Sequence, residues 1–242
     1  MDGTTEPLLV VIGHPIAGNP SQFALERALR WLELDWRVLS FDVPAENIAA
    51  ALEGFAVTGI AGVLVDRSVA EPAAAWYSEK CGRESVEVDC LTLGDDRRFV
   101  GSNERVGWVL DQLAAIPQER RLCFGNCSPE SEWSAKRLGA ERMVGNVKAI
   151  QIESAEGILI VDDLSGPPEL EMDEWPANDG STVVIDVTSG HPQRSRIIEL
   201  GYRVLTRTDH QVGVLQRALL RWTDREPGSD VIRDAVEEYL GV

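Results

Sequence analysis

Two polar segments that could bind or transform a small molecule stand directly after short apolar segments of this sequence. A loop rich in glycine and proline, Gly13–Pro20, follows the apolar run Leu8–Ile12. Asp66 and Arg67 follow the apolar run Ile60–Val65 in the same way. Because α/β sheets place ligands at the carboxyl ends of their strands, these loops are the first candidates for a site. A carboxylate there could exchange a proton, whereas an arginine keeps its proton near neutral pH.

The elements that must position these loops follow an α/β rhythm. Apolar runs predict strands, and apolar residues at helical spacing predict helices. In the first half we expect strands at 8–12, 36–41, 60–65, 86–93 and 99–102, with helices at 25–32, 44–55, 71–80 and 106–116 between or after them. In the second half we expect a strand at 122–124, a helix at 130–138, a hairpin of 149–152 with 158–161, an exposed loop at 165–181, a strand at 182–187, a helix at 194–200, a strand at 202–205 and helices at 212–222 and 229–240.

The composition limits the partners that we expect. The chain has 242 residues, with 40 acidic and 23 basic side chains and a formal net charge of −17. Such a surface repels phosphate backbones, so we expect neither nucleic acid nor an anionic membrane as a partner. No apolar run approaches the roughly 20 residues that span a bilayer, and the acidic N-terminal segment does not resemble a signal peptide. We therefore expect a cytoplasmic monomer or homodimer that binds an unidentified small molecule.

Neither the cysteines nor the histidines have the spacing of a metal site. We expect buried free thiols at the four cysteines, Cys81, Cys90, Cys123 and Cys127. We expect loop or helix-capping roles for the three histidines, His14, His191 and His210. The sequence thus predicts no metal ion.

Five segments, taken in order, resemble the shikimate dehydrogenase family. GHPIAGNPSQ is similar to the family's opening G-x-P-I-x-H-S-x-S-P, and DDRRFVGSNERVG is similar to its D-G-x-L-x-G-x-N-T-D. LDWRVLSFDVPAENIAAAL, GIAGVLV and GYRVLTRTDHQVGVLQRALLRWTDREP look like its second strand and helix, its third strand and its closing region. The resemblance implies an α/β fold with two domains, an N-terminal substrate-type domain with a mixed sheet (1–116) and a C-terminal Rossmann-like domain (117–225). A terminal helix (226–242) would pack back on the first domain.

The resemblance also implies a reaction, because members of this family of aromatic amino acid biosynthesis reduce 3-dehydroshikimate to shikimate with NADPH in a cleft between the domains. In the family a lysine and an aspartate flank the reacting oxygen, and here Ala70 and Arg105 stand at their positions. Neither residue can exchange the proton. The positions that would line the substrate cleft are Asn19, Ser21, Asp66, Asp89, Asn103, Glu104, Arg105 and Gln211.

The cofactor loop departs from the family as well. A phosphate cradle needs small residues so that backbone N–H groups can reach the pyrophosphate. Here the segment is CFGNCSPES, which retains Gly125 but has a proline, Pro129, near the helix start. The cofactor-binding positions implied by the resemblance are Gly125, Asn126, Lys148 and Thr188. We expect NADP to bind weakly or not at all.

Three hypotheses about function follow. The chain could be a catalytically inactive or regulatory homologue of shikimate dehydrogenase, which the simultaneous loss of the proton-transfer pair and the glycine loop favours. It could be an enzyme with changed chemistry that uses Asp66, Asp89, Glu104 and Arg105. It could also be a working shikimate dehydrogenase with atypical residues. The alternative for Asp66 and Arg67 is a structural role, in which they pair or cap the next helix, and Arg105 could pair with Glu104 or Asp66.

Overall fold

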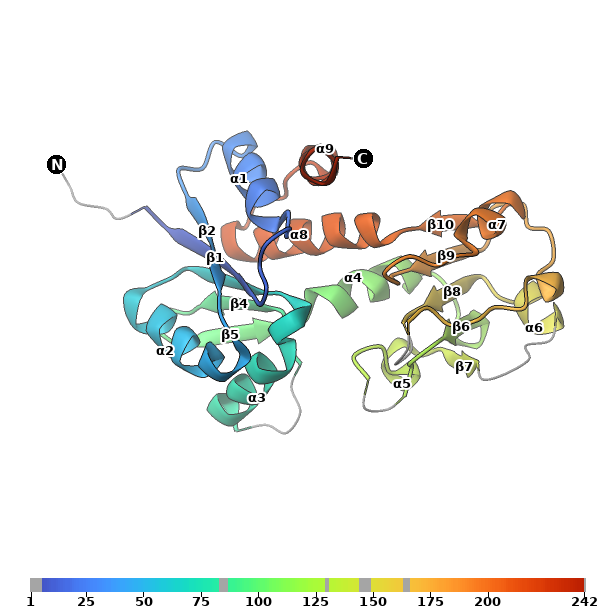
Figure 1. Cartoon of the computed structure of the whole chain (residues 1–242), viewed down its shortest axis with the longest axis horizontal. Helices are drawn as coiled ribbons and strands as arrows, with labels where there is room; N and C mark the ends of the chain where they lie inside the picture. Colours follow the sequence, from blue (N-terminus) through green and yellow to red (C-terminus); the bar gives the residue numbers. More distant parts are fainter. Residues whose placement is uncertain (1–5, 83–86, 129–130, 144–148, 163–165, 242) are drawn as a thin grey trace. The chain divides into compact units, whose positions relative to one another are not determined.

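The computed structural model describes residues 6–82, 87–128, 131–143, 149–162 and 166–241. The chain separates into two compact units (Figure 1), of which unit 1 contains residues 1–105 and 211–242 and unit 2 contains residues 106–210. The two boundaries between the units fall inside helices, α4 (Glu104–Leu113) and α8 (Arg207–Thr223). The resemblance implied boundaries at 116/117 and 225/226. Because both observed boundaries lie inside helices, no loop rich in glycine, proline or charged residues marks them in the sequence.

Unit 1 is built on a mixed sheet, as the resemblance implied. Its strand order is β2-β1-β3-β4-β5 among the described residues. The first three strands are parallel, and β4 and β5 run antiparallel to their neighbours. The strands are β1 (Leu8–Gly13), β2 (Arg37–Asp42), β3 (Gly62–Val65), β4 (Cys90–Leu93) and β5 (Phe99–Ser102).

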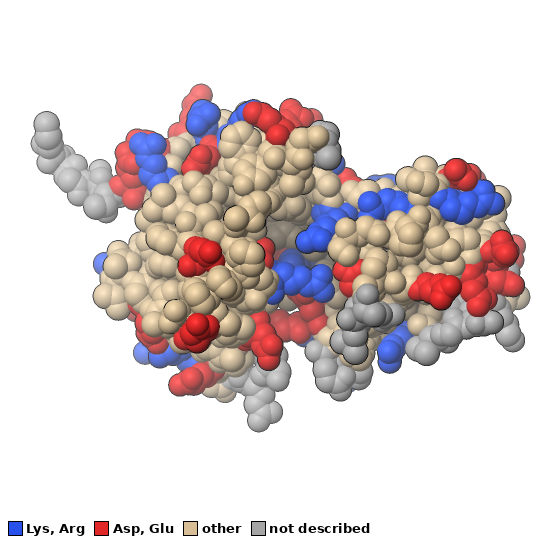
Figure 2. Space-filling view, in the orientation of Figure 1, with Lys and Arg blue, Asp and Glu red and all other residues tan. Residues whose placement is uncertain are grey.

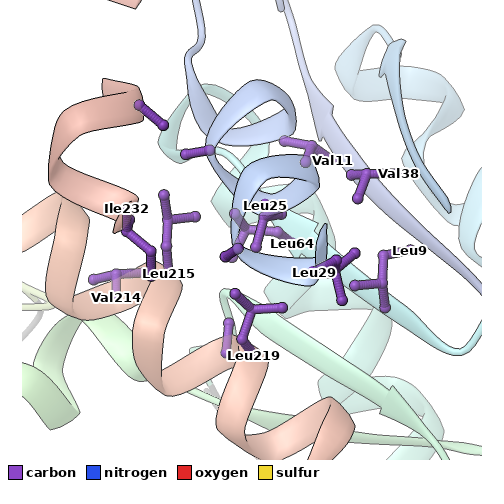
Figure 3. Packing of buried hydrophobic residues seen from close by; sticks show 14 of the residues in the cluster. Leu9, Val11, Leu25, Leu29, Val38, Leu64, Val214, Leu215, Leu219 and Ile232 are labelled. Atoms are coloured by element: carbon purple, nitrogen blue, oxygen red, sulfur yellow. The ribbon is translucent and has the colours of Figure 1, made fainter. Parts of the chain in front are cut away.

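Helices cover both faces of this sheet. Buried residues of β1 alternate between the two faces, because successive side chains of a strand point in opposite directions. Leu9 and Val11 pack in the cluster of α1, α8 and α9, whereas Val10 and Ile12 pack in the cluster of α2 and α3. Figure 3 shows Leu25 of α1 between the strands and α8. The helices are α1 (Ser21–Trp31), α2 (Ile48–Thr58), α3 (Ala70–Cys81) and α9 (Ser229–Leu240), with 3₁₀ turns at Ala45–Asn47 and Arg67–Val69.

Unit 2 contains a parallel sheet with the order β10-β9-β8-β6-β7 in its described part. Its strands are β6 (Arg121–Phe124), β7 (Glu141–Met143), β8 (Gly157–Ile160), β9 (Val183–Asp186) and β10 (Arg203–Leu205). Its helices besides α4 and α8 are α5 (Ala135–Leu138), α6 (Ala149–Glu153) and α7 (Arg194–Glu199), with 3₁₀ turns at Gln118–Arg120 and Met172–Glu174. The helices lie on both faces of the sheet, which is the Rossmann-like arrangement implied by the resemblance.

Three local predictions for unit 2 are wrong. Segment 149–153 is a helix rather than a strand, and β8 pairs in parallel with β6 and β9, so no hairpin forms. Of the helix expected at 130–138, Ala135–Leu138 is helical and 131–134 is not, while residue 130 lies outside the described residues. The loop expected to be exposed has buried anchors, because Leu170 and Trp175 pack in the core and Trp175 contacts the rings of Phe124 and Tyr202.

The acidic residues do not gather in one place on the face shown in Figure 2. Acidic side chains are scattered over both units there, with basic side chains among them. Within the part of the chain that the structure describes, no helix is long and apolar enough to cross a membrane. The charge on this face therefore identifies no particular binding surface.

Candidate functional site

The loop after β1 lies at the carboxyl end of the sheet of unit 1, as predicted from its sequence. Gly13 ends β1 and is in register with Asp42, the last residue of β2. Asn19 anchors the loop with both ends of its side-chain amide. Its Nδ2 donates to Asp66 Oδ2 at 2.9 Å, and its Oδ1 accepts the backbone N–H of Ser21 at 2.9 Å. Both polar atoms of Asn19 therefore already have protein partners.

Asp66 has a structural role at the end of β3. Its Oδ1 accepts hydrogen bonds from the backbone N–H of Ser68 at 2.9 Å and from the Ser68 hydroxyl at 2.7 Å. These contacts cap the 3₁₀ turn that leads into α3. Together with the bond from Asn19, they occupy both oxygens of the Asp66 carboxylate. The capping alternative for Asp66 is therefore confirmed.

Asp89 and Arg105 form a second group beside the end of β3. Asp89 is fully buried, and its two oxygens accept the backbone N–H groups of Glu104 and Arg105 at 2.6 and 2.7 Å, at the start of α4. The Arg105 guanidinium lies 3.5 Å from Asp89 Oδ2 and donates to the carbonyl of Val65 at 3.2 Å. Arg105 thus balances the charge of Asp89, a partner that the sequence did not suggest.

Glu104 is buried, and its carboxylate accepts hydrogen bonds from two arginines of α8. Arg217 Nε donates to Glu104 Oε2 at 2.8 Å, and Arg221 Nε donates to Oε1 at 2.6 Å. Burial raises the pKa of the Glu104 carboxyl, but hydrogen bonds from Ser102 and Arg221 and the charges of both arginines outweigh it, so the pKa lies below its ordinary value. Glu104 is therefore an ionised partner of two cations. Asp89 and Glu104 therefore each face guanidinium groups at this edge.

The remaining positions of the expected substrate site belong to other parts of unit 1. Ala70 is the first residue of α3, and Asn103 stands between β5 and α4. Ser21 is buried at the start of α1. Gln211 is half-buried in α8. The structure thus brings Asn19, Asp66, Asp89, Glu104 and Arg105 together around the carboxyl end of β3.

Two features of this edge were missed from the sequence. Arg217 and Arg221 are four residues apart, a spacing that places both on one face of α8, and this was the available signal. His14 Nδ1 lies 2.7 Å from Asp42 Oδ1, and the backbone N–H of His14 donates to Ser68 Oγ at 3.0 Å. The His14–Asp42 pair arises because the parallel register sets Gly13 beside Asp42. A carboxylate that holds one imidazole nitrogen fixes the orientation of the ring.

The loop after β6 in unit 2 contains a disulfide, Cys123–Cys127. The expectation of free thiols is therefore wrong for this pair, and Cys81 is exposed, so only Cys90 is a buried free thiol. Burial, and the nearby charges of Asp89 and Glu104, raise the pKa of the Cys90 thiol well above its ordinary value. Two cysteines four residues apart escaped prediction because their separation depends on the turn between them.

Gly125, at the centre of this loop, has a backbone conformation that suits glycine, with φ of +92°. A Cβ there would lie 2.0 Å from the carbonyl oxygen of Val161. The backbone N–H of Cys127 donates to the Gly125 carbonyl at 2.9 Å, so that group is turned into the loop. Helix α5 has one turn only. The described part of this segment therefore does not fit a dinucleotide pyrophosphate, which needs several backbone N–H groups facing outward.

The other candidate cofactor residues give little support to such a site. Thr188 is buried, and its hydroxyl donates to Asp186 Oδ1 at 2.6 Å. Asp186 also accepts a hydrogen bond from Arg194 at 2.6 Å. Asn126 is half-buried in the loop. Pro129 and Lys148 lie outside the described residues. No group of three metal-binding side chains occurs within the described ranges.

The sheets and their helices define a two-domain α/β protein with a mixed-sheet unit and a Rossmann-like unit. A shikimate dehydrogenase (NADP(+)) of Methanothermobacter thermautotrophicus is 23% identical over 270 residues, covering 95% of each chain. The shikimate 5-dehydrogenase of Thermus thermophilus, in complex with shikimate, superposes with a TM-score of 0.72, at 18% identity and over 98% of this chain and all (100%) of the other. These comparisons confirm the resemblance to the shikimate dehydrogenase family.

A reductase that is not named as a shikimate dehydrogenase has a similar fold. The 5-ketofructose reductase of Gluconobacter sp. strain CHM43 superposes with a TM-score of 0.73, at 18% identity and over 98% of this chain and 99% of the other. No family model matches the sequence.

Proposed function

We propose that this protein is a shikimate dehydrogenase homologue that does not catalyse the NADP-dependent oxidation of shikimate. The observation that carries the proposal is Arg105, which stands where the resemblance places an aspartate. Its guanidinium is engaged with Asp89 and with the carbonyl of Val65. Proton transfer by a positioned group contributes about 10²–10⁴ to a rate. An arginine held between two acceptors cannot make that contribution.

Two further observations support this proposal. Ala70 stands at the position of the family's lysine and carries no ionisable group. Glu104 and Asp89 are committed to arginines and to the start of α4, so neither is available as a replacement. The protein would then act by binding, as a regulatory or ligand-sensing relative of the enzymes.

A second candidate function is a reductase with a different substrate. Its support is the His14–Asp42 pair, because an imidazole oriented by a carboxylate is a common proton-transfer group. The fold shared with 5-ketofructose reductase adds to it, since that name states a substrate other than shikimate. A panel of hydroxy ketones and sugar ketones, assayed with NADPH and NADH, would separate the two candidates.

The proposal is tested by assay and by calorimetry on the full chain. Purified protein is mixed with shikimate and NADP, and the appearance of NADPH is followed by its absorbance between pH 7 and pH 9. The Thermus thermophilus enzyme serves as the positive control. We expect a rate equal to that of a blank, and an NADPH affinity no tighter than about millimolar, or about −4 kcal/mol. Turnover of one per second would show that the proposal is wrong.

A further inference from the structure

The Cys123–Cys127 disulfide lies across the segment where a dinucleotide-binding loop would begin. Cys123 is in β6, and Cys127 is the fourth residue after it, so the bridge closes a small ring that contains Gly125. Both cysteines are buried, in the core cluster beneath the loop. The bridge is therefore part of the loop's own framework and not a link between distant segments.

The ring fixes the direction of the loop's backbone. Cys127 donates its N–H to the Gly125 carbonyl at 2.9 Å and accepts the N–H of Ala135 at 3.2 Å. On the opposite side, Gly125 packs against the carbonyl of Val161 so closely that a Cβ would lie 2.0 Å from it. Cys127 is tied to β6 through its sulfur, and its N–H is turned toward the Gly125 carbonyl inside this ring. The bridge and this hydrogen bond thus both hold Cys127 with its N–H turned into the loop.

We propose that the Cys123–Cys127 disulfide is a reversible redox lock that closes the loop after β6 against dinucleotides. The step requires a dithiol reductant. When the loop opens locally and exposes a buried sulfur, one thiolate of the reductant attacks it and forms a mixed disulfide, and the second thiol of the reductant then releases the protein. The two cysteines gain two electrons and two protons and become thiols, while the reductant becomes a disulfide. The freed Cys127 can then move with the loop.

This inference rests on the proposed function, which states that the protein as folded binds NADP weakly. It goes further because it attributes the weak binding of NADP to a disulfide bond that can be reduced. The reduced protein keeps the loop residues that differ from the family's glycine-rich loop, and these residues limit the gain in NADP affinity. We expect reduction to tighten NADP binding by at least about tenfold.

The first part of the test counts the free thiols. The full-length protein is unfolded and alkylated with iodoacetamide without reductant, and its mass is measured. Two alkylated cysteines, Cys81 and Cys90, are expected, with four after treatment with dithiothreitol. Four without reductant would overturn the proposal, because no bridge would exist.

The second part measures NADP binding by calorimetry for the oxidised protein, the reduced protein and the variant Cys123→Ala/Cys127→Ala. The reduced protein alone decides the result if the variant does not fold. Cys81→Ser is the control, because it removes an exposed free cysteine and leaves the bridge intact. Tighter binding in the reduced protein supports the lock. Equal weak binding in both states overturns the lock and leaves the proposed function standing, whereas equal tight binding overturns both.

Discussion

Glu104 at the start of α4 and Arg221 near the end of α8 are joined by a hydrogen bond of 2.6 Å, although 117 residues of sequence separate them. Arg217, one turn earlier in α8, holds the other oxygen of the same carboxylate. Both helices belong in part to unit 1 and continue into unit 2. This ion pair therefore fixes the two helices to one another within unit 1.

Replacing the Glu104 carboxylate should destabilise unit 1. We expect Glu104→Gln to lower the free energy of unfolding by about 2–3 kcal/mol, because it leaves two guanidinium groups without their shared anion. Urea denaturation followed by tryptophan fluorescence measures the change. Glu238→Gln is the matched control, since Glu238 forms an exposed ion pair with Arg27 and exposed pairs contribute less than about 1 kcal/mol. Equal losses in the two variants would contradict the prediction.

The contribution of Glu104 should depend on pH. The pKa of Glu104 is lower in the folded protein than its ordinary value, despite the opposing effect of burial. The ion pair therefore stabilises the protein fully above the ordinary pKa of about 4.3 and loses this effect as the pH falls toward the folded pKa. Thermal unfolding of the wild type and of Glu104→Gln should differ most near neutral pH and converge in acid. A difference that stays constant from pH 7 to pH 3 would contradict this sign.

Gly62 of β3 should not tolerate a larger residue. A Cβ there would lie 2.4 Å from Nε1 of the Trp222 indole, which is buried and donates to the carbonyl of Leu91 at 3.1 Å. We expect Gly62→Ala to cost about 1–3 kcal/mol, through overpacking and displacement of the indole. Gly54→Ala is the control, because a Cβ at Gly54 in α2 would meet nothing within 4 Å. It should leave the urea midpoint unchanged or raise it, and a similar loss in both variants would refute the assignment.

Restoring the family's proton-transfer pair should not restore a shikimate dehydrogenase. In Ala70→Lys/Arg105→Asp the new carboxylate would stand beside Asp89, which loses its cation. Removing one partner of a buried ion pair costs about 3–5 kcal/mol. We expect lower stability and no turnover of shikimate above the blank, as measured by urea denaturation and NADPH absorbance. The single variant Ala70→Lys separates the two changes, since it leaves Arg105 in place.

Much of the fold could be predicted because its strands are short apolar runs bounded by glycine and proline. Leu8–Ile12 and 60–65 are completely apolar or nearly so, and they form the centre of the mixed sheet. The weaker segments of unit 2 were harder. Segment 149–153 has isoleucines two residues apart, which fits a strand, but only Ile152 is buried and Ile150 is exposed in the helix α6.

The candidate site could be located from the sequence, but its pairings could not. The loops after β1 and β3 were correctly placed at one edge of the sheet. However, the partners of Glu104 come from α8, and their approach depends on the packing of helices far apart in the sequence. The pairing of Asp89 with Arg105 similarly depends on β4 and α4 meeting at the end of β3. Such contacts are a tertiary property that local spacing does not determine.

The return of residues 211–242 to unit 1 has a consequence for the order in which the protein is made. Leu9 and Val11 of β1 share their core cluster with Ile232 and Val236 of α9, which packs on α1. A ribosome that has synthesised all of unit 2 has therefore not yet supplied the helix that completes unit 1. A chain ending at Thr223 should consequently keep unit 2 resistant to protease while unit 1 is cleaved. The older part of the nascent chain would thus be the last part to become folded.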